Sequence, residues 1–249
     1  MEIIRRIYTP LWKAWFVFNF ALIFLLCFPF MYVFLQKRKW FKYVFALKRV
    51  CSWWICFSSF IYLKKYWRTD RQKIPQPAVI IANHASYLDI VVSYLFLPHY
   101  FVFMGKGELA KIPLFGLLFK EMNITVNRKS TTDAHRALMK AGEEIERGNS
   151  VYIFPEGTIA DEGILKNFKN GAFKLAIDKQ VPIVPVTYIN NWRILQNGGF
   201  FKSLGCPGIA RIIIHEPVIT RGMTDENLVP LRQQLYDLTQ QTLEEFKRK

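Results

Sequence analysis

Two uncharged apolar stretches occupy the first quarter of the chain. Residues 14–36 form 23 consecutive positions without a formal charge. A helix of that length would measure about 35 Å, enough to cross a hydrocarbon core of about 30 Å. A second uncharged run, residues 51–63, is short for a membrane span and suits an interfacial or re-entrant helix. The pattern predicts a membrane-anchoring helical region over residues 1–73.

Lys and Arg flank both runs on every side, and this bears on how the anchor meets the membrane. A single spanning helix is expected to have its cations concentrated on one side. Their even distribution favours a helical hairpin that enters one leaflet and returns, with Pro29 as a candidate bend, over a single span. Two helices buried in a soluble core would not carry so many cations beside a run of this length.

After the linker at residues 74–77, short apolar runs alternate with amphipathic segments. Strands are predicted at residues 78–82, 100–104, 124–126, 151–154, 183–187 and 210–215. Helices are predicted from Ser86 to Phe96, from a cap at Thr131 or Thr132 to just before Gly148, from Asn170 onward, and over residues 225–247. This order predicts an α/β domain over residues 74–249, with a mixed, mostly parallel sheet flanked by helices.

Charge is distributed unevenly along the chain. The net charge is +15, but residues 1–75 hold 14 Lys and Arg against 2 acids, together with 22 of the 40 aromatic residues. Cations mixed with Trp and Phe beside apolar runs are typical of a membrane interface, so we expect lipid and not nucleic acid as the partner. The four cysteines have no zinc-ligand spacing, which predicts no metal site and fits a reducing compartment.

The first candidate chemistry follows the strand at 78–82, in Asn83-His84-Ala85-Ser86-Tyr87-Leu88-Asp89. Within one helix, positions five apart point about 140° apart, so His84 and Asp89 can meet only if His84 precedes a helix capped by Ser86. Asp89 would then orient the imidazole as a base, and a substrate hydroxyl would be the nucleophile. The alternative is structural, because Ser86 and Asp89 also satisfy a capping box.

A second candidate lies where the strand at 151–154 ends, in Phe154-Pro155-Glu156-Gly157-Thr158. An acid, a glycine and a hydroxyl at the carboxyl end of a strand could hold a polar substrate. The same residues also make an ordinary turn.

Together, N-H-x-S-x-x-D and, about 70 residues later, F-P-E-G-T resemble the glycerophospholipid acyltransferase family over about residues 75–220. The resemblance implies the glycerol-3-phosphate acyltransferase-like fold with an N-terminal two-helix membrane motif. It further implies that His84 is the general base and Asp89 its orienting partner. The substrate-binding residues that it implies are Lys106 and Arg128 near an anionic head group, Glu156, Gly157 and Thr158 at the acceptor's glycerol, and Pro185 in the pocket wall.

The implied reaction moves a fatty acyl group from a thioester, on acyl carrier protein or coenzyme A, to the free hydroxyl of a lysophospholipid. The first expected acceptor is 1-acyl-sn-glycerol-3-phosphate, which would give phosphatidic acid. The thioester is a co-substrate, and no resident cofactor or metal is implied. The family resemblance places the enzyme in the cell inner membrane, with its catalytic domain on the cytoplasmic face.

Two departures from the family pattern concern the acceptor. The family usually continues F-P-E-G-T with Arg and Ser, where this chain has Ile159 and Ala160, and an apolar side chain cannot replace a guanidinium. Met122 and Asn123 also stand where the family often has glycine. Cations that could compensate are Lys166, Lys169 and Lys174. The alternatives are therefore a lyso-ornithine or lyso-glycine lipid as acceptor, or a catalytically silent membrane-bound scaffold.

Overall fold

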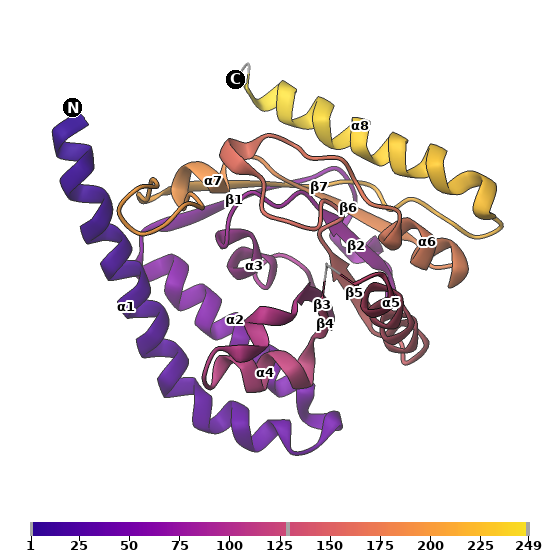
Figure 1. Ribbon diagram of the computed structural model, residues 1–249, viewed down its shortest axis with the longest axis horizontal. Helices are drawn as coiled ribbons and strands as arrows, with labels where there is room; N and C mark the ends of the chain where they lie inside the picture. The colour runs from indigo at the N-terminus through magenta and orange to yellow at the C-terminus, as the bar shows by residue number, and fades with distance from the viewer. Residues whose placement is uncertain (1, 128–129, 248–249) are drawn as a thin grey trace.

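The computed structural model describes residues 2–127 and 130–247, and its centre is one mixed sheet (Figure 1). The strands are β1 (Ile61–Trp67), β2 (Val79–Ala82), β3 (Phe101–Lys106), β4 (Ile124–Val126), β5 (Ser150–Ile153), β6 (Ile183–Tyr188) and β7 (Gly208–Ile214). Their order across the sheet is β1-β7-β6-β2-β5-β3-β4. Only β6 and β7 pair antiparallel among these neighbours, so the predicted mixed, mostly parallel sheet is confirmed.

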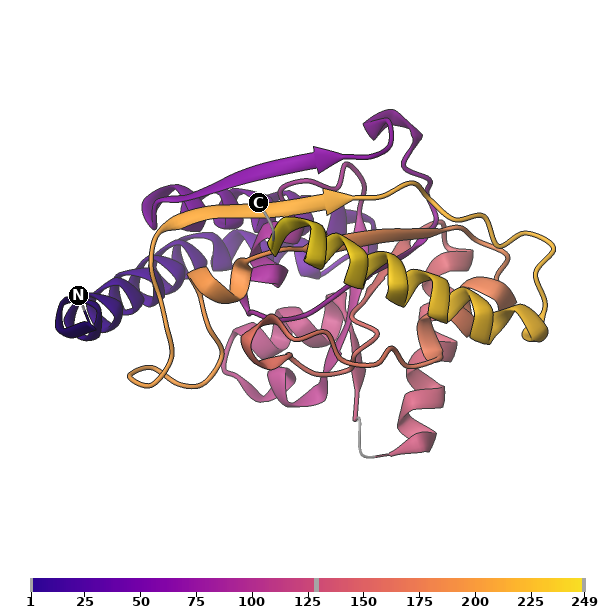
Figure 2. The ribbon, with the colours of Figure 1, turned by 90° about the horizontal axis from the view of Figure 1, so that it is seen from above.

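Helices cover both faces of the sheet, as predicted for an α/β fold (Figures 1 and 2). They are α1 (Glu2–Leu35), α2 (Phe41–Ser58), α3 (Leu88–Ser93), α4 (Phe115–Met122), α5 (Thr131–Glu146), α6 (Gly171–Asp178), α7 (Asn191–Ile194) and α8 (Leu228–Lys247). The central strand β2 alternates between the two cores, because successive side chains of a strand point to opposite faces. Val79 and Ile81 pack with α5, α6 and α8, whereas Ile80 and Ala82 pack toward α1, α2 and α3.

The first two helices form a hairpin, but its turn differs from the expected one. α1 continues through Pro29, and the chain reverses direction between Leu35 and Phe41, through a short 3₁₀ turn at Arg38–Trp40. Proline removes a single backbone donor, and the surrounding helical hydrogen bonds carry α1 past it. Pro29 is therefore not the bend of the hairpin.

The second uncharged run was expected to be helical throughout, and the structure differs there. α2 ends at Ser58, Phe60 adopts a positive φ of 56°, and Ile61 begins β1. β1 pairs in parallel with β7, so part of the expected anchoring region 1–73 belongs to the sheet. β1 is an edge strand whose Lys64 and Lys65 are exposed, and lysine on an edge strand blocks pairing with other chains.

The helix expected from Ser86 to Phe96 is shorter in the structure: α3 spans Leu88–Ser93, and its N-cap is Tyr87 and not Ser86, whose hydroxyl accepts from the backbone N–H of Leu88 at 3.0 Å. The remaining expected elements agree with the structure, with small differences at the caps. Ser130, and not Thr131 or Thr132, caps α5, because its hydroxyl accepts a hydrogen bond from the backbone N–H of Asp133. Asn170 precedes α6 as predicted. The short helices α4 and α7 were not predicted. α4 lines the cavity described next, and α7 carries Asn191, which binds Asp89.

Candidate active site

The site begins where β2 ends. The carboxamide of Asn83 pairs with the backbone of Tyr188 at the end of β6: its Nδ2 donates to the carbonyl at 2.9 Å, and its Oδ1 accepts from the N–H at 2.8 Å. The carboxamide thereby makes the two hydrogen bonds that a backbone amide would make with a neighbouring strand. It fixes the direction in which the chain leaves the sheet toward His84.

His84 and Asp89 meet, as the two motif positions require. His84 Nδ1 lies 2.9 Å from Asp89 Oδ2, and this oxygen also accepts from the backbone N–H groups of Ala85 and Ser86, each at 2.9 Å. The other oxygen, Oδ1, accepts from Asn191 Nδ2 at 2.7 Å. Asp89 is fully buried, and a carboxylate held by this many donors is an acceptor only. His84 Nδ1 therefore carries the hydrogen, which leaves the lone pair on Nε2.

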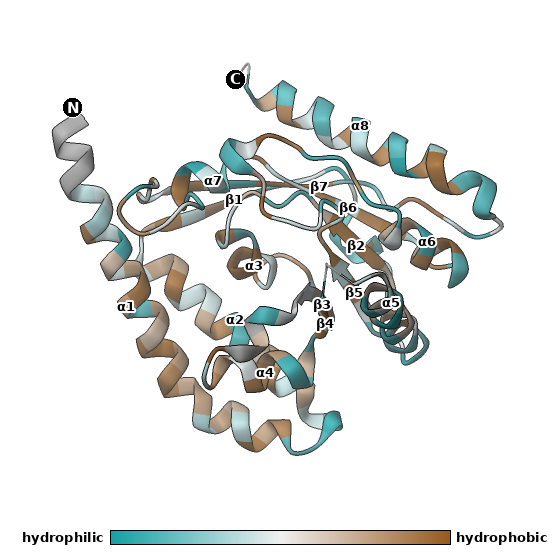
Figure 3. Cartoon of the chain, in the orientation of Figure 1, coloured by the Kyte–Doolittle hydropathy of each residue, from teal (hydrophilic) through white to brown (hydrophobic). Residues whose placement is uncertain are grey.

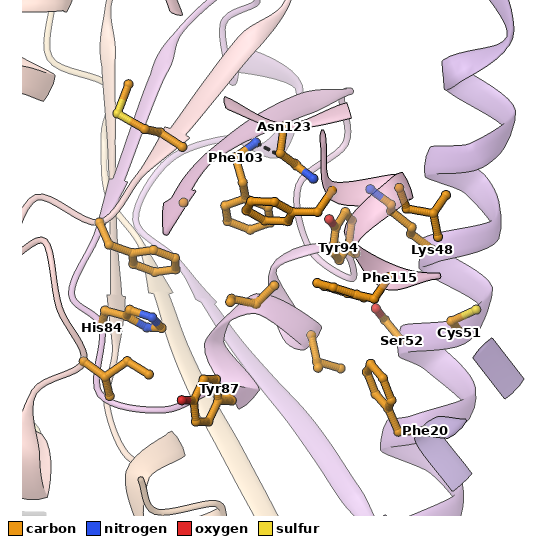
Figure 4. A pocket seen from close by; sticks show the side chains of 18 of the residues that line it. Phe20, Lys48, Cys51, Ser52, His84, Tyr87, Tyr94, Phe103, Phe115 and Asn123 are labelled. Atoms are coloured by element: carbon orange, nitrogen blue, oxygen red, sulfur yellow. Dashed lines mark hydrogen bonds between the residues drawn. The ribbon is translucent and has the colours of Figure 1, made fainter. Parts of the chain in front are cut away.

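The backbone and the ring of His84 are also held. Its N–H donates to Glu156 Oε1 at 2.7 Å, and its carbonyl accepts from the N–H of Ala160 at 2.7 Å. The imidazole stacks on the ring of Phe154, with centroids 3.9 Å apart and planes at 16°. Figure 4 shows the ring facing the cavity from the end of β2. The bond to Asp89 and the stacking on Phe154 together fix the orientation of the ring and therefore the position of Nε2.

Glu156 joins the two sequence motifs instead of lining the cavity. Its carboxylate is buried. Oε1 accepts a hydrogen bond from the backbone N–H of His84, and Oε2 accepts one from the backbone N–H of Lys166 at 2.9 Å. Burial raises the pKa of the Glu156 carboxyl to about 7, although both backbone donors favour its ionised form. The next two residues, Gly157 and Thr158, line the cavity.

A cavity of about 550 Å³ extends from His84 between α3 and α4 to α1 and α2. This volume lies within the usual range of small-molecule sites, about 300–1,000 Å³. Away from His84 the wall is largely apolar (Figure 4), and it includes Phe20, Phe24, Met31, Ile55, Ile90, Val91, Phe103, Phe115, Leu118 and Phe119. Such a wall fits a hydrocarbon chain better than a polar ligand.

Three of the other expected site residues are not placed in the cavity wall. One belongs to the sheet, and the other two are not covered, in whole or in their side chain, by the part of the chain that the structure describes. Pro185 lies in β6, in register with Ile81, and its carbonyl accepts from the N–H of His215, so it is part of the sheet and not of the cavity lining. Lys106 ends β3 beside Gly105, which lines the cavity, but the Lys106 side chain lies outside the described part of the structure. Arg128 also lies outside the described residues.

Of the three lysines that could replace the missing guanidinium, one reaches the cavity. Lys166 Nζ donates to the carbonyl of Ile159 at 3.2 Å and faces Asp161 at 3.9 Å. Lys174 forms ion pairs with two carboxylates, those of Asp178 and Asp225. Lys169 lines the cavity, and its ammonium lies so close to Gly157 that a Cβ added there would be 3.0 Å from Nζ. Gly157, with φ +72°, thus leaves room for this cation.

Sequence reasoning missed several residues that build the site. Asn83 stands inside the recognised motif, and its position directly after a strand was the available signal. Asn191 lies 102 positions after Asp89 and had no local signal. In the described ranges, no group of three His, Cys, Asp or Glu side chains could hold a metal ion.

Known proteins resemble both the sequence and the fold. The chain matches the model of the Acyltransferase family over residues 68–189. It is 33% identical over 188 residues to a 1-acyl-sn-glycerol-3-phosphate acyltransferase from Haemophilus influenzae, covering 71% of this chain and 72% of that protein. The crystal structure of a 1-acyl-sn-glycerophosphate acyltransferase from Thermotoga maritima superimposes with a TM-score of 0.81 and 25% identity, over 98% of each chain.

Longer relatives carry the same name. A chloroplast 1-acyl-sn-glycerol-3-phosphate acyltransferase from Brassica napus is 30% identical over 197 residues, which are 76% of this chain and 54% of that protein. The human beta enzyme is 33% identical over 181 residues, 70% of this chain and 63% of its own length. The chain thus spans between half and two thirds of these two relatives. On this similarity in sequence and fold, the chain belongs to the acyltransferase family that includes the 1-acyl-sn-glycerol-3-phosphate acyltransferases.

Proposed function

We propose that this protein transfers a fatty acyl group from an acyl thioester to the free hydroxyl of 1-acyl-sn-glycerol-3-phosphate, giving phosphatidic acid. The observation that carries the proposal is His84, whose Nδ1 is bound to Asp89 and whose ring opens onto a largely apolar cavity. Relatives named for this reaction support it.

His84 Nε2 takes the proton from the acceptor hydroxyl as its oxygen attacks the thioester carbonyl. The carbon–sulfur bond then breaks, and the thiolate leaves with the proton returned by the imidazolium. Asp89 keeps Nδ1 protonated and stabilises the transient positive charge, because it is a buried carboxylate 2.9 Å away. General-base catalysis of this type contributes a factor of roughly 10² to 10⁴ in rate.

The acyl chain of the donor occupies the cavity between α1, α2, α3 and α4. Its carbonyl lies at the His84 end, and its hydrocarbon contacts Phe20 and Phe24 of α1 and Leu118 of α4. The carrier, acyl carrier protein or coenzyme A, remains outside and leaves as the free thiol. The reaction requires no resident cofactor.

Lys169 holds the acceptor's phosphate in place of the missing guanidinium. It is the one of the three candidate lysines that lines the cavity, beside Gly157 and Thr158. Lys166 and Lys174 are engaged with protein oxygens. An ammonium binds phosphate as a point charge, without the bidentate geometry of arginine, so the site is less selective for orientation.

The α1–α2 hairpin lies in one leaflet of the membrane. Tyr8–Leu35 is long and apolar enough to span a bilayer, and Figure 3 shows α1 as largely hydrophobic. Yet buried positions recur along the whole of α1, at Trp12, Phe16, Asn19, Cys27, Met31 and Leu35. Because α1 packs lengthwise on the rest of the protein, an upright span would draw the polar domain into the bilayer. A hairpin at the cytoplasmic face of the inner membrane avoids this.

The assignment of the base is tested by His84→Ala in the purified enzyme, with acyl-coenzyme A and acyl carrier protein thioesters as donors. Transfer to 1-acyl-sn-glycerol-3-phosphate should fall by at least about 10²-fold, with the circular dichroism spectrum unchanged. His135→Ala, on the exposed face of α5, is the matched control and should keep full activity. An active His84→Ala enzyme would contradict the proposed mechanism.

The acceptor is tested by competition among lysophosphatidate, lyso-ornithine lipid, lyso-glycine lipid and monoacylglycerol with one donor. Lys169→Gln should raise KM for lysophosphatidate about ten-fold and leave KM for monoacylglycerol unchanged, whereas Lys169→Arg should restore binding. Lys166→Gln is the control. Preference for a phosphate-free acceptor would replace the proposed substrate, and no thioester consumption with any acceptor would favour the scaffold.

A further inference from the structure

We infer that the loop of residues 196–205 is a second membrane contact, which inserts Phe200 and Phe201 into the leaflet that holds α1, at the rim of the cavity. This inference rests on the proposed membrane-bound acyltransferase, because the loop would meet the lipid that the enzyme acylates. The loop connects α7 to β7 and lies beside the N-terminal half of α1 (Figures 1 and 2).

The loop has a defined conformation. An antiparallel bridge joins Leu195 and Gly205, and the backbone N–H of Gln196 donates to the carbonyl of Leu204 at 2.9 Å. Its tip passes through Gly198 and Gly199, with φ values of +132° and +97°, which side chains other than glycine rarely adopt. The two phenylalanines that follow are therefore presented by a closed, hydrogen-bonded loop.

A buried lysine of α1 attaches the loop to the helix. Lys13 Nζ donates to the carbonyls of Gly199 and Phe200, each at 3.1 Å, and to Ser203 through both its carbonyl and its hydroxyl. The approach is close, since a Cβ on Gly205 would lie 2.7 Å from Lys13 Cγ. An ammonium surrounded by four oxygens keeps the loop and α1 together as one body. A membrane that receives α1 therefore also meets the loop.

The side chains at the tip are apolar and project away from the protein. Phe201 is 81% exposed and Phe200 40% exposed, with their ring centroids 5.1 Å apart. The apolar surface of α1 reaches this point, because Val17, one turn after Lys13 on the same side of the helix, is 54% exposed. Aromatic rings followed by a lysine, here Lys202, are the side chains that favour the headgroup region.

The loop also borders the catalytic cavity. Asn197, three positions before Phe200, lines the same cavity as His84 and Lys169. Inserting the tip would place the cavity rim at the depth of the lipid headgroups, where a lysophospholipid presents its phosphate and free hydroxyl. An acidic carrier protein would instead be bound by a group of cations, so the paired phenylalanines favour lipid as the occupant.

The direct test measures depth in the bilayer. Phe201→Cys in a Cys206→Ser background is labelled with bimane and reconstituted in vesicles that contain brominated phospholipids. Val229→Cys in the same background is the matched control, because Val229 is an exposed apolar residue in the first turn of α8, and α8 begins at the end of the molecule away from α1 (Figure 1). We expect quenching at position 201 at least about three-fold stronger than at position 229. Equal quenching at both positions would overturn the inference.

A kinetic test separates lipid contact from carrier contact. Phe201→Asp should raise KM for bilayer-borne lysophosphatidate about ten-fold, leave KM for a short-chain soluble acceptor unchanged, and leave KM for the thioester unchanged, whereas Phe201→Leu should resemble the parent protein. An increase confined to acyl carrier protein would overturn the inference. The quenching measurement does not require the enzyme to be active. An inactive parent enzyme would therefore contradict the proposed function but leave the quenching test of the loop valid.

Discussion

The two ends of the cavity are built by different interactions. At the His84 end, the polar groups are held by directional hydrogen bonds, some local and some from distant segments: Asp89 by Asn191 and two nearby backbone N–H groups, and Glu156 by the backbone N–H groups of His84 and Lys166. At the α1 and α2 end, the wall consists mainly of aromatic and aliphatic side chains that contact one another by packing.

The difference separates two tasks. Reacting atoms must stay within about 0.5 Å of their productive positions, and hydrogen bonds from rigid elements achieve this. A hydrocarbon chain has no directional groups, so van der Waals contact with an adaptable wall is sufficient to bind it. Substitutions at the polar end should therefore change the rate of transfer, and substitutions at the apolar end should change which chain is transferred.

The largest effect is expected from Asp89→Asn. The amide would present an N–H₂ group to donors that now meet a carboxylate, and it would no longer fix the hydrogen on His84 Nδ1. kcat should fall about 10³-fold. Asp178→Asn, an exposed ion-paired aspartate, is the control for removing one charge. A loss of less than ten-fold would show that orientation by Asp89 is dispensable.

The buried Glu156 carboxyl predicts how stability depends on pH. Its pKa is raised to about 7 by burial, whereas an unfolded glutamate titrates near 4.3, so between these values the folded protein binds the additional proton. This stabilisation is complete below about pH 4 and is lost as pH rises through 7. At about 1.4 kcal/mol per pKa unit, the loss approaches about 4 kcal/mol.

Urea unfolding of the parent protein and of Glu156→Gln, at pH values from 4.5 to 8.5, measures this dependence. The difference in unfolding free energy between the two proteins should decrease as pH rises and then become constant above about pH 8. A difference that increases over this range would show that the two backbone donors, and not burial, dominate the pKa of Glu156.

A smaller effect is expected from Asn191→Ala, which removes one of the four hydrogen bonds to Asp89. A hydrogen bond to a charged group contributes about 1.5–3 kcal/mol, but the remaining three still orient the carboxylate, so kcat should fall about ten-fold. Asn190→Ala is the neighbouring control, because its amide bonds the carbonyl of Ile209 instead. Equal loss in both variants would attribute the effect to α7 as a whole.

The smallest effect on rate, and the clearest on selectivity, is expected at Leu118. This buried residue of α4 lines the apolar end, and Leu118→Trp would shorten the space available to a chain. The ratio of long-chain to short-chain donor use should fall about five-fold, while transfer from short donors continues. Leu117→Trp places the same ring on the exposed side of α4. A uniform loss for all chain lengths would show that the two ends are not separable.

Much of this protein was readable from its sequence because the signals are local. Six of the strands follow from short apolar runs, the long apolar helix α1 from an uncharged stretch, and the pairing of His84 with Asp89 from a strand that ends just before a short helix. Each depends on residues within a few positions of one another, where periodicity and capping chemistry decide the outcome.

The remainder was decided by contacts between distant segments. In the sequence, β1 looks like a continuation of the apolar run before it, and only its pairing with β7 in the folded protein identifies it as a strand. Glu156 binds the backbone of His84, Asn191 reaches Asp89, and Lys13 holds the loop at 196–205, across separations of 72 to 190 residues. No pattern along the chain encodes these partners, because a hydrogen bond depends on where the folded backbone places donor and acceptor, and that position is fixed only when the whole sheet and its helices have packed.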